Sequence, residues 1–124
     1  MLHDEDMTEI IIAAALEVHR HLGPGLLESA YEECMCRELA IRGTPFVRQV
    51  MLPLEYKGVK LDCGYRMDIV VSDRVIVELK CVDKILPIHE AQLLTYLKLF
   101  RKRTGLIINF NKALLRDGIK RLVL

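Results

Sequence analysis

The stretch Met67-Asp68-Ile69-Val70-Val71-Ser72-Asp73-Arg74-Val75-Ile76-Val77-Glu78-Leu79-Lys80 joins two apolar runs through a short polar segment. Valine and isoleucine favour β-strands, and serine and aspartate between them favour a turn, so the stretch predicts a β-hairpin. Side chains alternate between the two faces of a strand, which puts Glu78 and Lys80 on one face and Leu79 in the core. If Asp68 joins them, two carboxylates lie beside an amine. That set suits a divalent metal ion and a phosphodiester, because the ion takes hard oxygen ligands and the phosphate takes a cation.

The spacing of the two acidic residues makes this interpretation testable. Asp68 and Glu78 are ten positions apart and must share a face to bind one metal ion. Directly opposed residues of an antiparallel hairpin share a face, so the loop must contain an odd number of residues. A two-residue turn would place Asp68 opposite Val77, on the other face. We therefore predict a three-residue loop at residues 72–74, or a bulge near Asp68, and a regular two-residue hairpin would argue against the site.

The length and composition are those of one globular domain. The chain has 124 residues, enough for one core, and we expect residues 1–124 to fold as one unit. A hydrophobic fraction of 52% with only 6% aromatic residues predicts an aliphatic core. No apolar run approaches the roughly 18 residues of a membrane span, and the acidic start is not a signal peptide. We therefore expect a cytoplasmic protein with no membrane partner.

The charges are segregated along the chain, although the net charge is only +1. Residues 1–40 hold nine acidic and two basic residues, and residues 98–124 hold eight basic residues and one acidic residue. A basic C-terminal quarter could contact the backbone of a polyanion. A solvated face balanced by an acidic helix accounts for the same pattern equally well.

The four cysteines do not form a common metal-binding pattern. Cys34 and Cys36 make a C-x-C pair, and Cys63 and Cys81 follow at wide spacing, with no CxxC pair and no histidine doublet nearby. We expect buried free thiols in a reducing compartment. A redox or cluster protein is the alternative, and the colour and iron content of the purified protein would reveal it.

The rest of the chain predicts an α/β fold. A capping box formed by Asp6 and Glu9 and a helical repeat of apolar residues predict a first helix. A break that ends at Gly25 separates this helix from a second predicted helix. The predicted helices span residues 8–21, 26–42 and 87–103, and the predicted strands span residues 46–56, 59–71, 74–81, 104–110 and 119–124. The order ααβββαβ(β) predicts a mixed sheet flanked by helices. It includes a right-handed parallel crossover and a last strand at the sheet edge.

Three further candidate residues lie outside the hairpin. Glu28 lies in the first turn of the second predicted helix, where it complements the helix dipole or, alternatively, reaches the same metal ion. Gln92 and Tyr96 are four apart and share a helix face, with His89 on nearly the same stripe. An ordinary amphipathic helix explains that stripe. The alternative is that it flanks the same cleft, because this helix follows the strand that carries Lys80. We expect His89 to be peripheral.

These residues resemble known motifs. Residues 25–31, Gly-Leu-Leu-Glu-Ser-Ala-Tyr, reproduce the G-x-x-E-x-x-Y signature of the GxxExxY protein family. Asp68 with Glu78-Leu79-Lys80 resembles the core of the PD-(D/E)XK nuclease superfamily, and residues 92–96 resemble the Q-x-x-x-Y motif of its exonuclease-like branches. Met67 stands where the superfamily usually has a proline, at a position that varies. The resemblance covers nearly the whole chain.

The resemblance implies a restriction-endonuclease-like αβββαβ core and a metal centre. Asp68 and Glu78 would be ligands of Mg²⁺ or Mn²⁺, and Glu28 would be an auxiliary ligand.

The resemblance also implies roles for the polar residues around that centre. Lys80 would orient or activate the attacking water and stabilise the charge on the phosphate, while Gln92 and Tyr96 would assist at the scissile phosphate. The implied activity is nuclease cleavage of nucleic acid, with DNA preferred to RNA as the partner.

A catalytically silent scaffold of the same fold is the main alternative. It would bind nucleic acid or a protein within a larger complex. We expect a minimal domain without an appended module that selects a substrate, which favours a protein partner or a homodimer. Intact Asp68, Glu78 and Lys80 argue against loss of the site, and a Mn²⁺ titration separates the two interpretations, because a scaffold need not bind metal.

Overall fold

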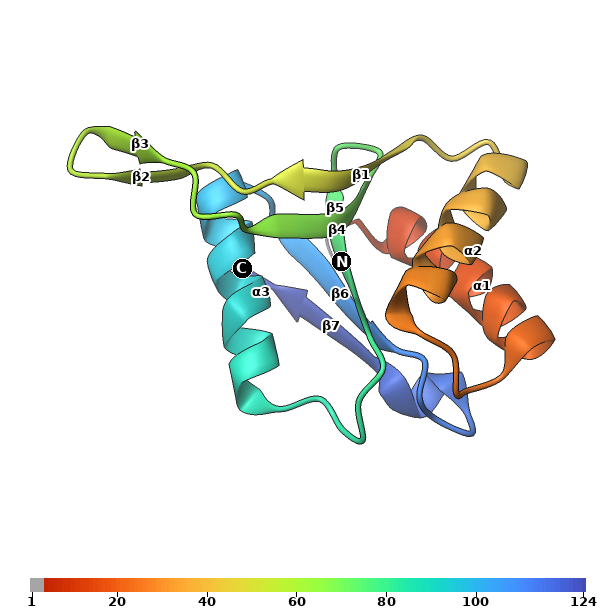
Figure 1. Ribbon diagram of the computed structural model, residues 1–124. Coiled ribbons are helices and arrows are strands. Elements are labelled where there is room, and N and C mark those ends of the chain that lie inside the picture. Colours follow the sequence, from red (N-terminus) through yellow and green to blue (C-terminus); the bar gives the residue numbers. More distant parts are fainter. Residues whose placement is uncertain (1–3) are drawn as a thin grey trace.

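A mixed five-stranded sheet lies between helices in this computed structural model, which describes residues 4–124 (Figure 1). Residues 1–3 of the expected domain lie outside the described residues. In chain order the elements are α1 (Glu5–Leu22), α2 (Glu28–Ile41), β1 (Phe46–Met51), β2 (Leu54–Tyr56), β3 (Val59–Leu61), β4 (Arg66–Val71), β5 (Val75–Lys80), α3 (Pro87–Phe100), β6 (Thr104–Asn109), the 3-10 helix η1 (Leu115–Gly118) and β7 (Ile119–Val123). This is the α/β fold with a mixed sheet flanked by helices that the sequence predicts.

The sheet has the strand order β1-β4-β5-β6-β7. β5 and β6 are parallel and are connected through α3, as expected for a strand-helix-strand unit, and the other neighbours are antiparallel. β7 is an edge strand, as the sequence predicts. β5 is central, and its two flanking strands and the helices bury five of its six residues. A central strand buried on both faces explains the unbroken apolar run before Glu78.

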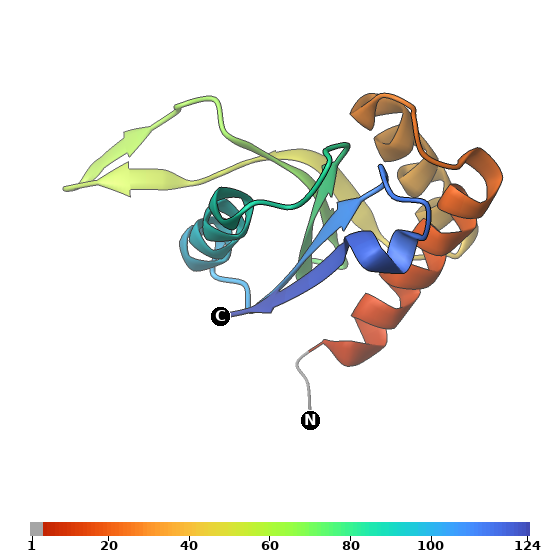
Figure 2. The same cartoon turned by 90° about the horizontal axis from the view of Figure 1, so that it is seen from below.

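Two hydrophobic clusters fix the helices to the two faces of the sheet (Figure 2). The α1–α2 cluster joins these two helices to one face and includes Ile69, Val77 and Leu79. The α3 cluster joins the third helix to the other face and includes Met67, Val70 and Ile76. Neighbouring residues of β5 therefore face different helices.

Gly105 brings α3 close to β6. A Cβ atom at this position would lie 2.9 Å from Leu93 Cδ1, closer than packed carbon atoms approach. The absent side chain thus lets Leu93 pack directly onto the β6 backbone. The position of α3 matters for the site, because this helix carries Gln92 and Tyr96.

Two of the predicted strands are each divided into two. β1 and β2 replace the predicted strand 46–56, and β3 and β4 replace the predicted strand 59–71. Pro53 explains the first break, because it has no N–H to donate to a ladder. β2 and β3 form their own two-stranded sheet, which we call the β2–β3 arm (residues 54–61). The arm projects beyond α3 and the main sheet (Figures 1 and 2).

The predicted start of the first helix is wrong. α1 begins at Glu5, so Asp6 lies inside the helix rather than at its cap. Its Oδ1 instead accepts a hydrogen bond from Arg74 Nη2 at 2.8 Å, and Asp4 Oδ1 accepts one from Arg74 Nε at 2.9 Å. A partner 68 residues away therefore replaces the capping box.

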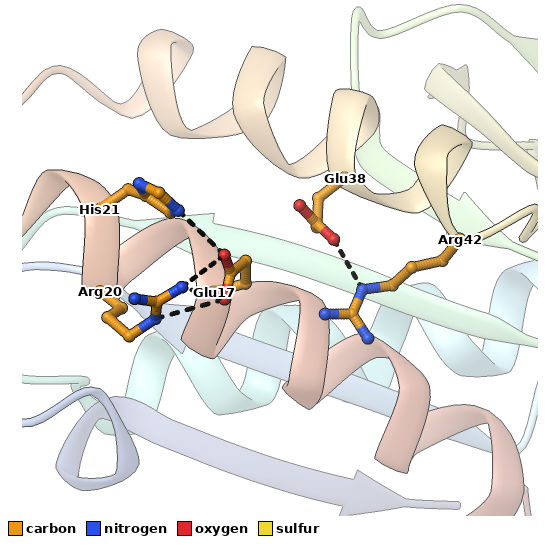
Figure 3. A network of polar contacts seen from close by, with 5 residues as sticks. All are labelled: Glu17, Arg20, His21, Glu38 and Arg42. Carbon is orange, nitrogen blue, oxygen red and sulfur yellow. Dashed lines mark hydrogen bonds and ion pairs between the residues drawn. The ribbon is translucent and has the colours of Figure 1, made fainter.

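The outer surfaces of α1 and α2 carry ion pairs within each helix (Figure 3). Glu17 of α1 contacts Arg20 at 2.7 Å and His21 at 2.9 Å, and Glu38 of α2 contacts Arg42 at 2.8 Å. Exposed pairs of this kind contribute little to stability, because water and salt screen them. They explain part of the acidic N-terminal third as ordinary helix-surface charge.

The cysteines are free thiols, as expected, but they are not uniformly buried. Cys36 is buried, Cys34 and Cys81 are half-buried, and Cys63 is exposed in the connection between β3 and β4. The expectation of four buried thiols is therefore wrong at Cys63, because the divided strand leaves this connection outside the sheet. Within residues 4–124, the helices are all too short or too polar to cross a membrane.

Candidate active site

The β4–β5 hairpin has the three-residue loop that the spacing predicts. Val71 pairs with Val75, so residues 72–74 form the loop. Ser72 and Asp73 have φ angles of 51° and 54°, the left-handed conformation of tight hairpin turns. The odd loop length gives the acidic residues the common face that one shared site requires.

The carboxylate pair, Asp68 and Glu78, lies where the β4–β5 ladder ends. The backbone pairing ends at Ile69 and Val77. Beyond it, the Asp68 N–H donates to Glu78 Oε2 at 2.9 Å, and the Leu79 N–H donates to Asp68 Oδ2 at 2.8 Å. Each carboxylate thus accepts a backbone N–H that the ladder no longer satisfies. This exchange holds the two acidic groups side by side.

β1, the neighbouring strand on the other side of β4, has an irregular backbone opposite Asp68. Gln49 of β1, across from Asp68, has a φ of 51°, while the residues on either side of it pair regularly with β4. A left-handed backbone costs a residue other than glycine about 1–2 kcal/mol. Met67 joins the α3 cluster and Ile69 joins the α1–α2 cluster, although a regular strand would put them on one face. β4 therefore twists sharply at Asp68.

Glu32 of α2 holds this irregular segment in place. Its Oε1 accepts a hydrogen bond from Gln49 Nε2 at 2.7 Å, and its Oε2 accepts one from Arg48 Nη2 at 2.7 Å. Only 9% of Glu32 is exposed, so these charge-assisted bonds are shielded from water. They offset the strain at Gln49. The sequence gives no local signal for this network, because its members lie 16 and 17 residues apart.

Lys80 lies on the face of β5 opposite to Leu79, the face it shares with Glu78. It is half-buried, and its backbone carbonyl accepts a hydrogen bond from the Phe110 N–H at 3.0 Å. Its charge acts on both members of the carboxylate pair and lowers the pKa of each, against the larger effect of burial. The predicted amine is therefore close enough to the two acids to interact with them electrostatically.

Asn109 fixes the chain that follows Lys80. It is fully buried beside Lys80 in the parallel β5–β6 register. Its Nδ2 donates to the Val82 carbonyl at 2.8 Å, and its Oδ1 accepts from the N–H groups of Val82 and Asn111 at 3.1 and 3.2 Å. Sequence reasoning missed this residue. A polar side chain inside the apolar run that ends at Phe110 was the available signal.

Burial and mutual repulsion shift the pKa values of the carboxylate pair. Burial first, and the charge of Asp68 second, raise the pKa of Glu78 to about 9. Burial also raises the pKa of Asp68, while its hydrogen bond from Leu79 acts in the opposite direction. The pair therefore retains a proton at neutral pH when no cation is bound. Such shifted acids are common at functional sites.

Glu28 of α2 is close enough to the carboxylate pair to interact with Asp68 electrostatically. It is the first residue of that helix, and its pKa is raised, first by desolvation and then by the charge of Asp68. Tyr31 fixes the turn that precedes it, because its hydroxyl donates to the Gly23 carbonyl and accepts from the Leu26 N–H. The Tyr31 ring is buried and stacks on Phe110 at 4.4 Å. The tyrosine of the G-x-x-E-x-x-Y stretch thus acts structurally, by placing Glu28.

The α3 residues lie on the other side of the carboxylate pair. Burial first, and the charge of Glu78 second, raise the pKa of Tyr96 to about 12, so its hydroxyl keeps its proton. Gln92 is half-buried and lines a cavity together with Tyr96. His89 also lines this cavity, and its Nδ1 accepts a hydrogen bond from the Leu86 N–H at 3.0 Å. That bond gives His89 a structural task at the start of α3.

The donor set at the carboxylate pair fits a hard divalent cation. The backbone bonds use Asp68 Oδ2 and Glu78 Oε2, and the two side chains also hydrogen-bond to each other, a bond that an ion held by both carboxylates would replace. A cation would also remove the charge repulsion that raises the pKa of Glu78. Within residues 4–124, no three His, Cys, Asp or Glu side chains gather closely enough to hold a metal ion. The centre thus offers two carboxylates, and a contribution from Glu28 stays a prediction.

This fold and site define a class of protein, in which a mixed sheet flanked by helices presents an acidic pair and a lysine at the end of a strand ladder. A model of the PD-(D/E)XK nuclease superfamily matches residues 5–122. The chain belongs to the PD-(D/E)XK nuclease superfamily, as the motif at residues 68–80 predicts. The narrower resemblance to the GxxExxY family stays a prediction. A search of curated proteins and a search of solved structures each found no match.

Proposed function

We propose that the chain is a nuclease that depends on Mg²⁺ or Mn²⁺ and hydrolyses phosphodiester bonds, in DNA in preference to RNA. The carboxylate pair carries this proposal, because the buried Glu78 and the half-buried Asp68 share one face beside a lysine and retain a proton unless a cation replaces it. Burying two acids together is costly, and a metal site is a physical reason to keep them.

The residues of the site have distinct roles in this proposal. Asp68 and Glu78 would hold the ion, with Glu28 as an auxiliary ligand. A bound divalent ion supplies Lewis-acid polarisation of the phosphate and lowers the pKa of a water molecule. Lys80 places a fixed positive charge near the phosphate and orients the attacking water, and it acts strongly because the site is partly shielded from solvent.

Gln92 and Tyr96 complete the proposed site from the side of α3. The Tyr96 hydroxyl keeps its proton at physiological pH, so it donates a hydrogen bond to a phosphate oxygen. The Gln92 amide offers both a donor and an acceptor next to it. Both side chains are positioned by the packing of α3 on the sheet rather than by a mobile loop.

The first test is cleavage of single-stranded, duplex, nicked and branched DNA and RNA in Mn²⁺ and in Mg²⁺. Lys80→Ala should lower the cleavage rate by about 100-fold or more, the usual cost of removing a charge-stabilising group. Lys84→Ala is the matched control, since Lys84 is an exposed lysine four residues further along the chain. Unfolding curves of both variants should match that of the native chain.

Three outcomes decide the proposal. Cleavage that is lost in Lys80→Ala and kept in Lys84→Ala supports it. Equal cleavage by the native chain and Lys80→Ala contradicts it. If no condition gives cleavage and a Mn²⁺ titration shows no binding, the chain is a scaffold of this fold, the alternative that the sequence left open.

A further inference from the structure

A cavity of about 480 Å³ is lined by Gln92 and Tyr96, the two α3 residues of the proposed site, and the proposed hydrolysis uses only part of it. Its volume lies within the range of small-molecule sites. Tyr96 connects it to the proposed site, because this tyrosine lines the cavity and packs in the α3 cluster with Met67, the residue before Asp68. We call it the Tyr65 cavity, and the lining residues used below are Leu52, Leu54, Tyr65, His89, Gln92 and Tyr96.

Tyr65 presents an accessible aromatic ring at a fixed place in this cavity. The residue is 49% exposed, and its ring meets that of Tyr96 edge to face, with 6.4 Å between the ring centroids. The Leu52 N–H donates to the Tyr65 carbonyl at 3.1 Å, which ties its backbone to the end of β1. Tyr65 also lies three residues before Asp68 in the chain. An exposed aromatic side chain is thus anchored close to the carboxylate pair.

A positively charged groove continues from the Tyr65 cavity. It has a volume of about 700 Å³ and lies between the β2–β3 arm and the end of α3. Leu52, Leu54 and Leu99 line both spaces. Its lining includes three basic residues and one acidic residue, Lys60, Lys98, Arg101 and Glu55. We call it the basic groove.

We propose that the Tyr65 cavity binds an unpaired nucleobase of the substrate strand, and that the basic groove binds the neighbouring phosphates. This inference rests on the proposed nuclease function and names its substrate class. A base needs an aromatic face for stacking and an amide for its polar edge, and Tyr65 and Gln92 offer these. The lysines and the arginine of the groove complement a polyanion. An apolar peptide segment would have no use for those cations.

The same geometry selects among nucleic acids. A base that is paired and stacked within a duplex presents only its edge in a groove, so it cannot place its face on Tyr65. The preferred substrate is therefore a strand with unpaired nucleotides next to the scissile phosphate, such as a single strand, an overhang or a flap.

The test measures binding without cleavage. The native chain is titrated in EDTA with a fluorescein-labelled single-stranded DNA and with a blunt duplex of the same sequence, and fluorescence anisotropy is recorded. Tyr65→Ala should weaken single-strand binding by roughly 5- to 140-fold, the range for loss of one base stack, and should leave duplex binding unchanged. Tyr65→Phe should restore binding, because stacking uses the ring rather than the hydroxyl.

Tyr56→Ala is the matched control. Tyr56 is also an exposed tyrosine, 63% accessible and located on the β2–β3 arm, but it lies outside the lining of the Tyr65 cavity. A 2-aminopurine base in the single strand gives a second readout, since stacking on a tyrosine quenches its fluorescence. Quenching should be present in the native chain and in Tyr56→Ala, and absent in Tyr65→Ala.

The basic groove has its own test. The double variant Lys60→Ala with Lys98→Ala should lower the slope of log K against log salt by up to about 1.4, which corresponds to two phosphate contacts on a single strand. Arg116→Ala is the charge control, because Arg116 is exposed on η1, far from the β2–β3 arm (Figure 1). An unchanged slope in the double variant would overturn the assignment of the groove.

The outcomes separate this inference from the proposed function. Equal losses in Tyr65→Ala and Tyr56→Ala, or no preference for the single strand, would overturn the base site. If duplex cleavage is nevertheless found, the nuclease proposal survives that result. Binding that depends on Tyr65, with no cleavage under any metal condition and no Mn²⁺ binding, would support the base site and remove the nuclease.

Discussion

Replacing Glu78 by glutamine should stabilise the metal-free protein, although it removes a proposed metal ligand. The pKa of Glu78 rises from 4.5 to about 9 on folding, so at pH 7 the folded protein holds a proton that the unfolded chain has released. Each pH unit above 4.5 costs the folded state about 1.4 kcal/mol until the folded pKa is reached. The cost at pH 7 is therefore about 3 kcal/mol. Glutamine avoids it, because it is neutral and keeps a carbonyl oxygen for the Asp68 N–H.

The sign of this effect sets its pH dependence. A carboxyl group whose pKa is raised by folding destabilises the folded state above its unfolded pKa, and the penalty grows with pH. Glu78→Gln should thus gain about 1 kcal/mol at pH 5 and about 3 kcal/mol at pH 7. Urea unfolding in EDTA at pH 5, 6, 7 and 8 measures the difference.

The controls separate this mechanism from a general effect of lost charge. Glu55→Gln makes the same change at an exposed position of β2 and should leave the unfolding free energy unchanged at every pH. Saturating Mn²⁺ should stabilise the native chain more than Glu78→Gln, because the ion binds only the folded state and needs the carboxylate. A gain that does not vary with pH, or no gain at pH 7, would refute the reasoning.

Three further predictions follow from the contacts around the carboxylate pair. Mn²⁺ binding should release a proton, because the carboxylate pair retains one without the ion, and the affinity should rise by up to about tenfold per pH unit from pH 6 to 8. Calorimetry in two buffers of different ionisation enthalpy detects the proton release. Equal heats of binding in the two buffers would contradict it. Asn109→Ala should lower the unfolding free energy by roughly 2–4 kcal/mol, since it leaves the backbone N–H and carbonyl of the half-buried Val82 without their partners. A loss below about 1 kcal/mol in urea unfolding would show that water replaces the side chain. Tyr31→Phe should lower the unfolding free energy by about 1–2 kcal/mol, because the hydrogen bonds to Gly23 and Leu26 are lost. It should slow cleavage only if Glu28 acts at the proposed centre, and single-turnover rates at saturating Mn²⁺ would show this.

The sequence was sufficient to predict the features that follow from local periodicity. The spacing of ten between Asp68 and Glu78 required an odd loop, and the ladder from Val71 to Val75 has that loop. The apolar run before Glu78 correctly indicated a buried strand. The connection of β5 to β6 through α3 followed from the order of the elements, because a parallel pair needs a crossover.

Features that depend on distant contacts were not predictable in the same way. Asp6 looked like part of a capping box but pairs with Arg74, 68 residues away. The bonds of Glu32 to β1 leave no trace in any local pattern, and neither does the left-handed backbone of Gln49. Pro53 is a local signal for the break between β1 and β2. The sequence interpretation did not use it, because residues that favour β-strands continue on both sides of this proline.

The carboxylate pair has a structural task as well as its proposed chemical one, and this changes how its mutants must be interpreted. Asp68 Oδ2 accepts the Leu79 N–H, and Glu78 Oε2 accepts the Asp68 N–H, at the point where the strands stop pairing. An alanine at Asp68 removes an acceptor and leaves a backbone donor unsatisfied, which costs about 1–3 kcal/mol. Loss of cleavage in Asp68→Ala would therefore combine loss of a ligand with local unfolding.

Asp68→Asn keeps an oxygen for Leu79 and removes only the charge, so its cleavage rate isolates the role of the carboxylate in the chemistry. Normal stability with lost Mn²⁺ binding in Asp68→Asn would assign the ligand role, whereas retained Mn²⁺ binding and cleavage would remove Asp68 from the proposed centre.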